Sequence, residues 1–404
     1  MSAKRPINVV VLIDALGWHY IENRVFLNQD LPYRQNLRTI LGFSSGAIPT
    51  IMTGLPPART GHWNLFYYDP EKSPFRWMKP LRILPNFVTE HRITRRLITE
   101  LGRRVLGMGP GFECCVSPKL LPLFNWVERK NIYGNDAITG APSIFDQLRD
   151  EKIPFKVYSY HEASDAEILK QTESDLRSTD ASFFFVYLCE MDMFLHLHCH
   201  ESAEIDKKLK WYEAELSKLF AIAKEIDPNA RLMLTSDHGM TPVMNHYDLL
   251  GRLEPLDLRS PQDYLAVFDS TMARFWYFNE RARKAVNEAC ADLPCGRWLT
   301  DDELKRAGVF FEDRRFGEQI YLLSPGWLLS RSDFNGAGWT PSGMHGYHPE
   351  DSYSDAVFLS NHAPGIAMST IADVYPVMRE ASRRALGRDS TTDQREQVAS
   401  EVRG

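Results

Sequence analysis

Six side chains in four separate segments of the chain are of the types that bind divalent metal ions. They are Asp14, Asp192, His196, Asp237, His238 and His345. Catalytic zinc sites commonly take three protein ligands from His and carboxylate side chains and leave one position open. Six candidates are therefore enough for two such sites.

Two neighbouring metal ions, roughly 3.5–4 Å apart, form a clamp suited to phosphoryl transfer. This chemistry also needs an oxygen nucleophile beside one ion. Ser44 and Ser45 are the candidates, and they lie in the segment Phe43–Gly54 at what we expect to be the start of a helix. Serine is a common helix N-cap, and a helix N-terminus attracts phosphate groups. Either serine could be the nucleophile that contacts a metal.

Short apolar runs alternate with amphipathic segments and predict the elements that position these groups. Buried strands are expected at Asn8–Ile13, Phe155–Tyr160, Ser182–Leu188 and Arg231–Thr235, and helices at Ser143–Arg149 and Asp206–Ile226. This alternation is typical of an α/β fold with a doubly wound, mostly parallel central sheet and helices on both faces. Ligands of such sheets bind beyond the carboxyl ends of the strands. Asp14, Asp192 and Asp237 each follow a predicted strand, so we expect their loops to meet there.

Two stretches interrupt the alternation and are expected to cap the core as insertions. They lie at about 65–135 and 258–330. The prediction is therefore a single catalytic domain over residues 1–385. Residues 386–404 are polar, and we expect them to form a mobile tail.

Composition excludes several other classes of protein. Net charge is −6, which does not favour a dedicated nucleic-acid binder. The six cysteines form no C-x-x-C pair, so a structural zinc knuckle is not expected. We find neither a signal peptide nor an apolar run long enough to cross a membrane, and we expect a cytoplasmic protein.

Five motifs occur in the order found in the alkaline phosphatase superfamily, and the chain most resembles its type I phosphodiesterase/nucleotide pyrophosphatase family. The motifs are Asp14 after the first strand, Ser44 ten residues before the Gly of Thr53-Gly54, Asp192-x-x-x-His196, Ser236–Met240 (SDHGM) and Gly343–Tyr347 (GMHGY). Together they span more than 300 residues.

The resemblance implies an alkaline-phosphatase-like fold and a metal-dependent phosphoric ester hydrolase with two divalent ions. One ion would be held by Asp192, His196 and His345, and the other by Asp14, Asp237 and His238 beside Ser44. Zinc is expected, with manganese or iron as alternatives. Ser44 would attack phosphorus in a phosphodiester or pyrophosphate and form a covalent seryl intermediate, which water then hydrolyses.

The chain departs from the family near the nucleophile. Ala47 stands where the family usually has an Asn that contacts a phosphate oxygen. Phosphomonoesterase activity therefore stays open, and so does a non-catalytic binding scaffold. The expected partner is a small phosphoester, with Ser45, Trp63 and Asn64 as substrate contacts. The sequence does not indicate an oligomeric state.

The segment 76–104 contains eight Lys or Arg and two Glu, a local charge of about +6. Three roles are open for it. It is a solvated helix face, a wall of the pocket that binds an anionic substrate, or a contact with an acidic membrane surface.

Overall fold

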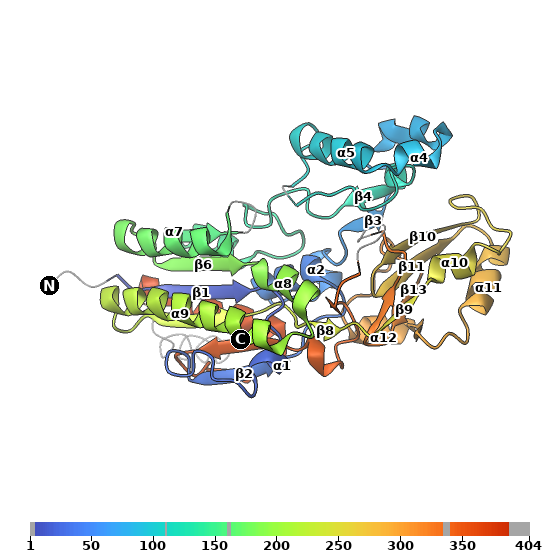
Figure 1. The fold of residues 1–404 in the computed structure, drawn as a ribbon. Helices are drawn as coiled ribbons and strands as arrows, with labels where there is room; N and C mark the ends of the chain where they lie inside the picture. Colours follow the sequence, from blue (N-terminus) through green and yellow to red (C-terminus); the bar gives the residue numbers. More distant parts are fainter. Residues whose placement is uncertain (1–4, 110, 160–162, 334–339, 388–404) are drawn as a thin grey trace, which may run out of the picture.

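The computed structural model describes residues 5–109, 111–159, 163–333 and 340–387. A six-stranded sheet forms its centre (Figure 1). In spatial order its strands are β2 (Tyr33–Leu37), β16 (Ala356–Ser360), β7 (Arg231–Thr235), β1 (Asn8–Ile13), β6 (Phe183–Leu188) and β5 (Phe155–Tyr158). Strands β7, β1, β6 and β5 are mutually parallel, whereas β16 is antiparallel to both of its neighbours. The predicted mostly parallel sheet is confirmed.

Strand β1 is buried on both faces, which explains its unbroken apolar run. Val9, Val11 and Ile13 pack in one core, and Val10 and Leu12 pack in another. The first core is covered by α1 (Trp18–Ile21), α7 (Asp165–Ser178) and α9 (Ser202–Ile226). The second is covered by α2 (Ser44–Thr53), α6 (Ile144–Asp150) and α13 (Val374–Arg383). Helices thus cover both faces, as predicted.

The predicted boundaries differ from the observed ones by a few residues. Helix α9 begins at Ser202, four residues before the expected start at Asp206. Helix α6 begins after Ser143, whose hydroxyl accepts from the Asp146 backbone in a capping box. Strand β5 ends at Tyr158, and Tyr160 lies outside the described residues. The predicted tail likewise lies outside them from residue 388 onward.

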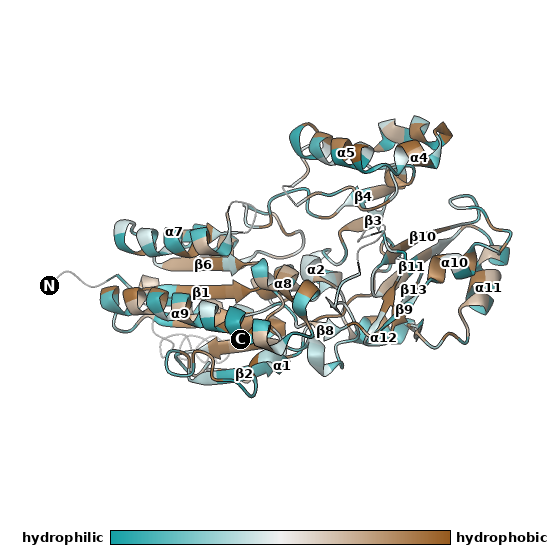
Figure 2. Ribbon diagram, viewed as in Figure 1, coloured by the Kyte–Doolittle hydropathy of each residue, from teal (hydrophilic) through white to brown (hydrophobic). Residues whose placement is uncertain are grey.

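The two predicted insertions lie beyond the carboxyl ends of the strands (Figure 1). The first contains β3 (Phe66–Tyr68), η1 (Arg76–Ile83), α4 (Asn86–Thr89), α5 (Arg92–Arg104), η2 (Leu121–Leu123) and β4 (Phe124–Trp126). The second contains a four-stranded antiparallel sheet of β10 (Tyr264–Asp269), β11 (Met272–Tyr277), β13 (Gln319–Leu323) and β12 (Gly296–Trp298), with α11 (Glu280–Ala289) and α12 (Asp301–Arg306). Figure 2 shows that β1 and β6 of the central sheet and β11 of this second sheet are largely hydrophobic.

The two insertions share one apolar cluster, to which β10 and β11 contribute Leu265, Val267 and Trp276. Arg274 reinforces the contact because its fully buried guanidinium pairs with Asp269 and donates to the carbonyl of Phe66 at 2.9 Å. A buried arginine is tolerated only when its donors are satisfied in this way. The insertions therefore pack on each other as well as on the core.

The remaining short elements connect these parts. They are α3 (Pro57–Thr60), α8 (Glu190–His198), β8 (Thr241–Pro242), β9 (Asn245–Tyr247), α10 (Leu249–Leu253), β14 (Trp327–Leu329), β15 (Gly343–Met344), η3 (Ser352–Ser354), η4 (Ile371–Asp373) and η5 (Arg384–Leu386). No helix in the described part of the chain has the length and apolar character needed to span a membrane.

Candidate active site

Three neighbouring strands of the sheet, β7, β1 and β6, end at the same edge, and each is followed by an acidic residue. Asp14 comes directly after β1, and its backbone N–H donates to the carbonyl of Leu188 at the end of β6 at 2.9 Å. Asp192 lies in the first turn of α8, which follows β6. Asp237 lies two residues after β7. The three acidic loops therefore meet as expected.

His345 reaches the same edge through a contact distant in sequence. It follows β15, which pairs antiparallel with β8, and β8 begins three residues after His238. The rings of His238 and His345 stack with centroids 3.9 Å apart and planes 14° apart. This pairing places His345 against His238.

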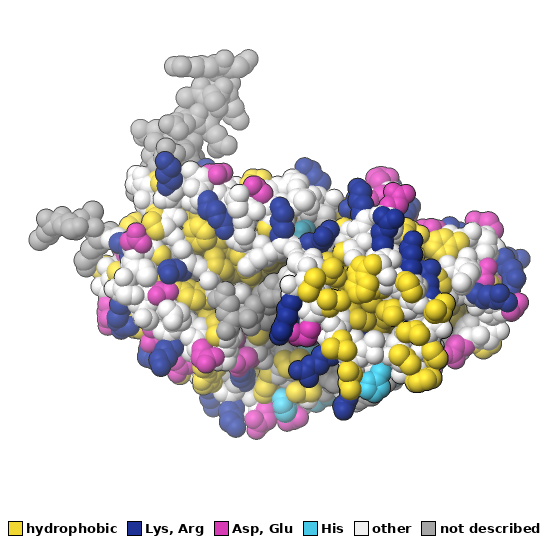
Figure 3. Space-filling model, turned by 90° about the horizontal axis from the view of Figure 1, so that it is seen from above, with side chains coloured by type: hydrophobic (Ala, Val, Ile, Leu, Met, Phe, Trp, Pro, Cys, Tyr) yellow, Lys and Arg dark blue, Asp and Glu magenta, His cyan; other side chains and the backbone are white. Residues whose placement is uncertain are grey.

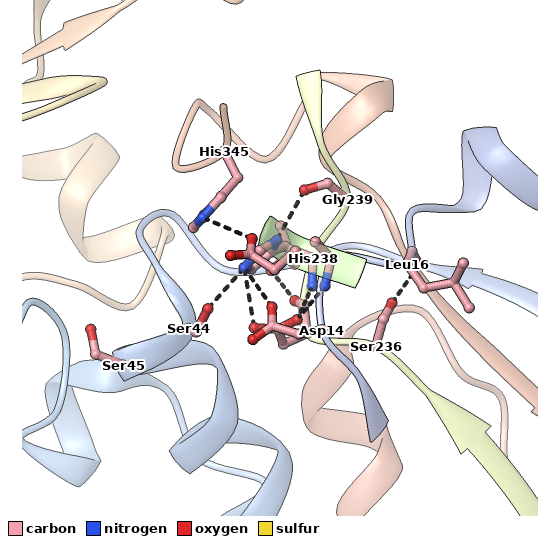
Figure 4. A network of polar contacts seen from close by, with 12 residues as sticks. Asp14, Leu16, Ser44, Ser45, Ser236, His238, Gly239 and His345 are labelled. Carbon is pink, nitrogen blue, oxygen red and sulfur yellow. Dashed lines mark hydrogen bonds and ion pairs between the residues drawn. The ribbon is translucent and has the colours of Figure 1, made fainter. Parts of the chain in front are cut away.

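The structure brings all six candidate ligands together in two groups of three. Asp192, His196 and His345 form one group, and Asp14, Asp237 and His238 form the other. Within each group, one ligand atom from each residue lies within 4.8 Å of the others. Nε2 of His238 lies 3.5 Å from Oδ1 of Asp14 and 3.2 Å from Oδ2 of Asp237 (Figure 4).

In Asp14 and Asp237, one carboxylate oxygen accepts a hydrogen bond and the other has no donor among the described residues. Asp14 Oδ2 accepts from the hydroxyl of Tyr187, and Asp237 Oδ1 accepts from the backbone N–H groups of Ala15 and His238 at 3.2 and 3.0 Å. Within the described residues, Asp14 Oδ1, Asp237 Oδ2 and Asp192 Oδ1 are buried without a hydrogen-bond donor. Buried oxygens without a partner are costly, and a bound cation satisfies them. Tyr187 carried no signal in the sequence beyond its place in a strand.

Two of the histidines turn Nε2 toward the carboxylates of their own group and Nδ1 toward a backbone carbonyl. Nδ1 of His196 lies 2.8 Å from the carbonyl oxygen of Gly343, and Nδ1 of His238 lies 2.9 Å from that of Gly239. Because a carbonyl oxygen only accepts, each Nδ1 carries the proton and each Nε2 offers its lone pair. Such backbone partners are typical of metal-binding histidines.

The pKa values of Asp14 and His345 reflect burial and the charges crowded at the site. Burial, and then the neighbouring carboxylates Asp237 and Asp192, raise the pKa of Asp14 well above its usual value. Burial and the adjacent His238 lower the pKa of His345 well below its usual value. A neutral imidazole is the form that binds metals, and a divalent ion would offset the repulsion among the carboxylates. Imidazole and carboxylate donors together suit zinc, manganese or iron.

The hydroxyl of Ser44 faces this cluster. Phe43 occupies the N-cap position, so Ser44 is the first residue of α2 and its side chain does not cap the helix. Its Oγ lies 2.9 Å from Nε2 of His238 (Figure 4). Ser45 instead donates its hydroxyl to the carbonyl oxygen of Trp63 at 2.6 Å. Of the two candidates, the geometry favours Ser44 as nucleophile.

The family to which the chain belongs follows from comparison with known proteins. The model of the type I phosphodiesterase/nucleotide pyrophosphatase family matches residues 8–348. The chain belongs to this family. As a family member it is a hydrolase of the phosphodiesterase/nucleotide pyrophosphatase type, and the family is metal-dependent.

Solved structures of family members share the fold. Human ectonucleotide pyrophosphatase/phosphodiesterase 5 superposes with a TM-score of 0.66 at 14% identity, over 93% of this chain and 95% of that one. The murine protein gives 0.64 at 14% identity over the same shares. An inactive variant of the murine protein, solved in complex with AMP, gives 0.65 at 15% identity over 94% and 95%. No curated protein matches the chain significantly in sequence.

The structure also locates the positions at which this phosphodiesterase/nucleotide pyrophosphatase differs from its family's pattern. Ala47 is buried in the core side of α2 and offers no polar group. Trp63, predicted to touch substrate, is fully buried and its indole N–H donates to the carbonyl of Leu41 at 2.6 Å. Asn64 is buried as well, but its Oδ1 lacks a donor within the described residues. Asn64 therefore stays the better candidate for a substrate contact.

The two histidines beyond His196 on the same segment bind elsewhere. Nδ1 of His198 lies 3.1 Å from a carboxylate oxygen of Glu201, and Nε2 of His200 lies 3.4 Å from the carbonyl of Val243. Neither belongs to the two groups of candidate ligands found among the described residues.

The glycine of the SDHGM motif is required by close packing. A Cβ at Gly239 would lie 2.1 Å from the carbonyl oxygen of Tyr353. We expect Gly239→Ala to lower the free energy of unfolding by about 1–3 kcal/mol, as overpacking does elsewhere. Urea unfolding of the chelated protein measures this without the contribution of metals.

Gly365→Ala is the matched control for that measurement. The nearest atom to a Cβ at Gly365 is a flexible carboxylate oxygen of Glu380, at 3.5 Å. Its stability should stay near that of the wild type. Equal stability of the Gly239→Ala and Gly365→Ala proteins would contradict the packing argument.

Proposed function

We propose that the protein hydrolyses phosphodiester or pyrophosphate bonds with two divalent metal ions and a covalent intermediate on Ser44. One observation carries the proposal: the hydroxyl of Ser44 lies 2.9 Å from His238 Nε2, beside buried oxygens of Asp14 and Asp237 that have no hydrogen-bond donor among the described residues. A nucleophile next to a ready set of metal ligands is the arrangement that two-metal phosphoryl transfer needs.

The two groups of ligands would hold one ion each. Asp192, His196 and His345 are proposed for one site, and Asp14, Asp237 and His238, with Ser44, for the other. When bound, such ions lower the pKa of the nucleophile and neutralise charge on the phosphoryl oxygens. Zinc is the proposed metal because half of the ligands are imidazoles.

The chain itself positions the phosphoryl group. Ser44 opens a ten-residue helix, so the backbone N–H groups of the first turn point toward the nucleophile's side of the site. These groups and the helix dipole favour an anion there. Attack by Ser44 Oγ forms the new P–O bond while the bond to the leaving alcohol or phosphate breaks. Water then cleaves the seryl ester.

Asn64 is proposed as the amide that contacts the substrate, since Ala47 cannot. A Cβ at Gly46 would lie 3.2 Å from Cα of Trp63, so the chain before Asn64 runs against the first turn of α2. The AMP complex of the murine structural neighbour supports a nucleotide as substrate or product.

The ratio of kcat/KM for bis-p-nitrophenyl phosphate to that for p-nitrophenyl phosphate tests the reaction class. We expect a ratio well above one for zinc-loaded protein, because the chain belongs to a phosphodiesterase/nucleotide pyrophosphatase family. A ratio well below one would identify a phosphomonoesterase. If the metal-loaded protein hydrolysed neither of these two esters nor any dinucleotide, the result would favour a binding scaffold.

A further inference from the structure

The first insertion exposes an apolar surface that its own fold does not use. Between η1 and the end of α5, large apolar side chains are exposed to solvent: Trp77, Ile83, Leu84, Phe87, Val88, Ile93, Leu97 and Val105. Ile83 is 86% exposed, Phe87 78% and Leu97 65%. We call this surface the α4–α5 face. Contiguous exposed apolar patches mark interaction sites, whereas single exposed residues do not.

Figure 3 looks down on this side of the molecule. Hydrophobic side chains gather in a large area of this view, and Lys and Arg side chains lie along its upper and left margins. Figure 1 shows that α4 and α5 lie at the outer limit of the insertion, beyond β3 and β4. The side chains of the α4–α5 face are exposed to solvent at this outer limit.

Helix α5 has a separate apolar stripe that does hold the insertion together. Ile98 and Gly102 are buried, and a Cβ at Gly102 would lie 2.4 Å from the ring of Phe112. This contact fixes which side of the helix turns inward. Ile93 and Leu97 are one helical turn apart on the exposed side. The inner stripe completes the core of the insertion, whereas the outer stripe is exposed to solvent.

The charge of the surface is opposite to that of the whole protein. Segment 76–104 carries a net charge of about +6 in a chain of net charge −6. Arg95 forms an ion pair with Glu90 and donates hydrogen bonds to the carbonyl oxygens of Cys114 and Cys115. Lys79, Arg92 and Arg96 are exposed, and none of them forms an ion pair with another described residue. Free cations thus rim the apolar side chains.

We propose that the α4–α5 face docks on the surface of an anionic lipid bilayer. An ordinary solvated helix face would not expose Phe87, Ile83 and Leu97 together. Apolar and aromatic side chains that enter the headgroup region, with Lys and Arg on their rim, are the features of interfacial membrane binding. The positive charge is complementary to anionic headgroups. The proposal is independent of the reaction at the metal site.

Flotation of the full-length protein with vesicles tests the docking. We expect it to partition onto vesicles of equimolar phosphatidylcholine and phosphatidylglycerol, and at least about tenfold less onto phosphatidylcholine alone. High salt should weaken binding, because exposed charges are screened. Phe87→Ser with Leu97→Ser should reduce the partition coefficient about tenfold or more, since each side chain loses its burial in the interface.

Two further variants make the test specific. Val25→Ser with Met244→Ser changes side chains that are 79% and 71% exposed but belong to other surfaces, and binding should not change. Arg92→Gln with Arg96→Gln should reduce binding to the anionic vesicles about tenfold and leave binding to phosphatidylcholine unchanged. All these positions are exposed, so the variants should fold.

Three outcomes would overturn the proposal. The first is an absence of vesicle binding by the wild type. The second is equal loss of binding in the Val25/Met244 control. The third is a dimer of the wild type in sedimentation that the Phe87/Leu97 variant abolishes while vesicles remain unbound, since the face would then join two copies of the chain.

Discussion

Replacing Ser44 with alanine should reduce kcat on a phosphodiester by about 10³-fold or more, as loss of a covalent nucleophile does in other hydrolases. The reason is local: Ser44 is the hydroxyl that lies 2.9 Å from His238 Nε2 and faces the candidate ligands. Bound metal, measured by elemental analysis, should stay near the wild-type value because all six carboxylate and imidazole ligands remain. Steady-state kinetics of the metal-loaded variant supplies the measurement.

Ser45→Ala is the matched control, because the two serines are neighbours on the same helical turn. The Ser45 hydroxyl is bound to the Trp63 carbonyl. We expect kcat of this variant to stay within about tenfold of wild type, the loss reflecting one hydrogen bond. A reversed pattern, with Ser45→Ala inactive and Ser44→Ala active, would show that the nucleophile was assigned to the wrong serine.

A covalent intermediate adds a second readout for Ser44. Acid quenching during turnover should trap a phosphoryl adduct on the wild-type protein, detected as a mass increase on the peptide that contains Ser44. Ser44→Thr retains a hydroxyl and should form the same adduct. The alanine variant should form none, and an adduct on it would indicate another acceptor.

Part of this fold was predictable because four of the six strands of the central sheet appear in the sequence as local apolar runs, whereas β2 and β16 were not predicted. Asn8–Ile13 and Arg231–Thr235 are apolar runs whose lengths match buried strands, and the structure reproduces both bounds. Parallel neighbours must end at one edge, so the meeting of Asp14, Asp192 and Asp237 followed from topology alone. The ligand types came from the residues, and their grouping came from the family resemblance.

Other features depend on contacts that no local pattern reveals. The position of His345 is set by the pairing of β15 with β8, two strands of two residues each. Tyr187 binds Asp14 through a side chain that reads only as part of a buried strand. Trp63 offered an aromatic surface in the sequence, yet packing encloses it completely. The division into one domain with two insertions stays a prediction, although the shared cluster shows that the insertions pack as one layer.

Replacing Asp237 with asparagine should remove one of two bound metal ions. The two oxygens of the Asp237 carboxylate have different surroundings. Oδ1 accepts hydrogen bonds from the N–H groups of Ala15 and His238. Oδ2 has no donor within the described residues and lies 3.2 Å from His238 Nε2. Asparagine can keep the two N–H bonds through its amide oxygen but presents an uncharged NH₂ where Oδ2 stood. The site of Asp14, Asp237 and His238 then loses a ligand and a negative charge, whereas Asp192, His196 and His345 are untouched.

Elemental analysis should therefore find about two zinc ions per wild-type chain and about one per Asp237→Asn chain. The variant's kcat should fall by at least about 10²-fold, since losing a metal ligand costs at least as much as losing an outer-shell partner. Asp175→Asn alters another buried carboxylate, which accepts from Tyr158 at 2.8 Å, and should keep both ions. Chelation should destabilise the wild type more than the Asp237→Asn protein, by about 4 kcal/mol for a site held at a thousand times its dissociation constant. If the variant still bound two ions, Asp237 would not be a ligand, and its donor-free oxygen would need another explanation; if the wild type bound none and chelation changed nothing, the paired groups would not be metal sites.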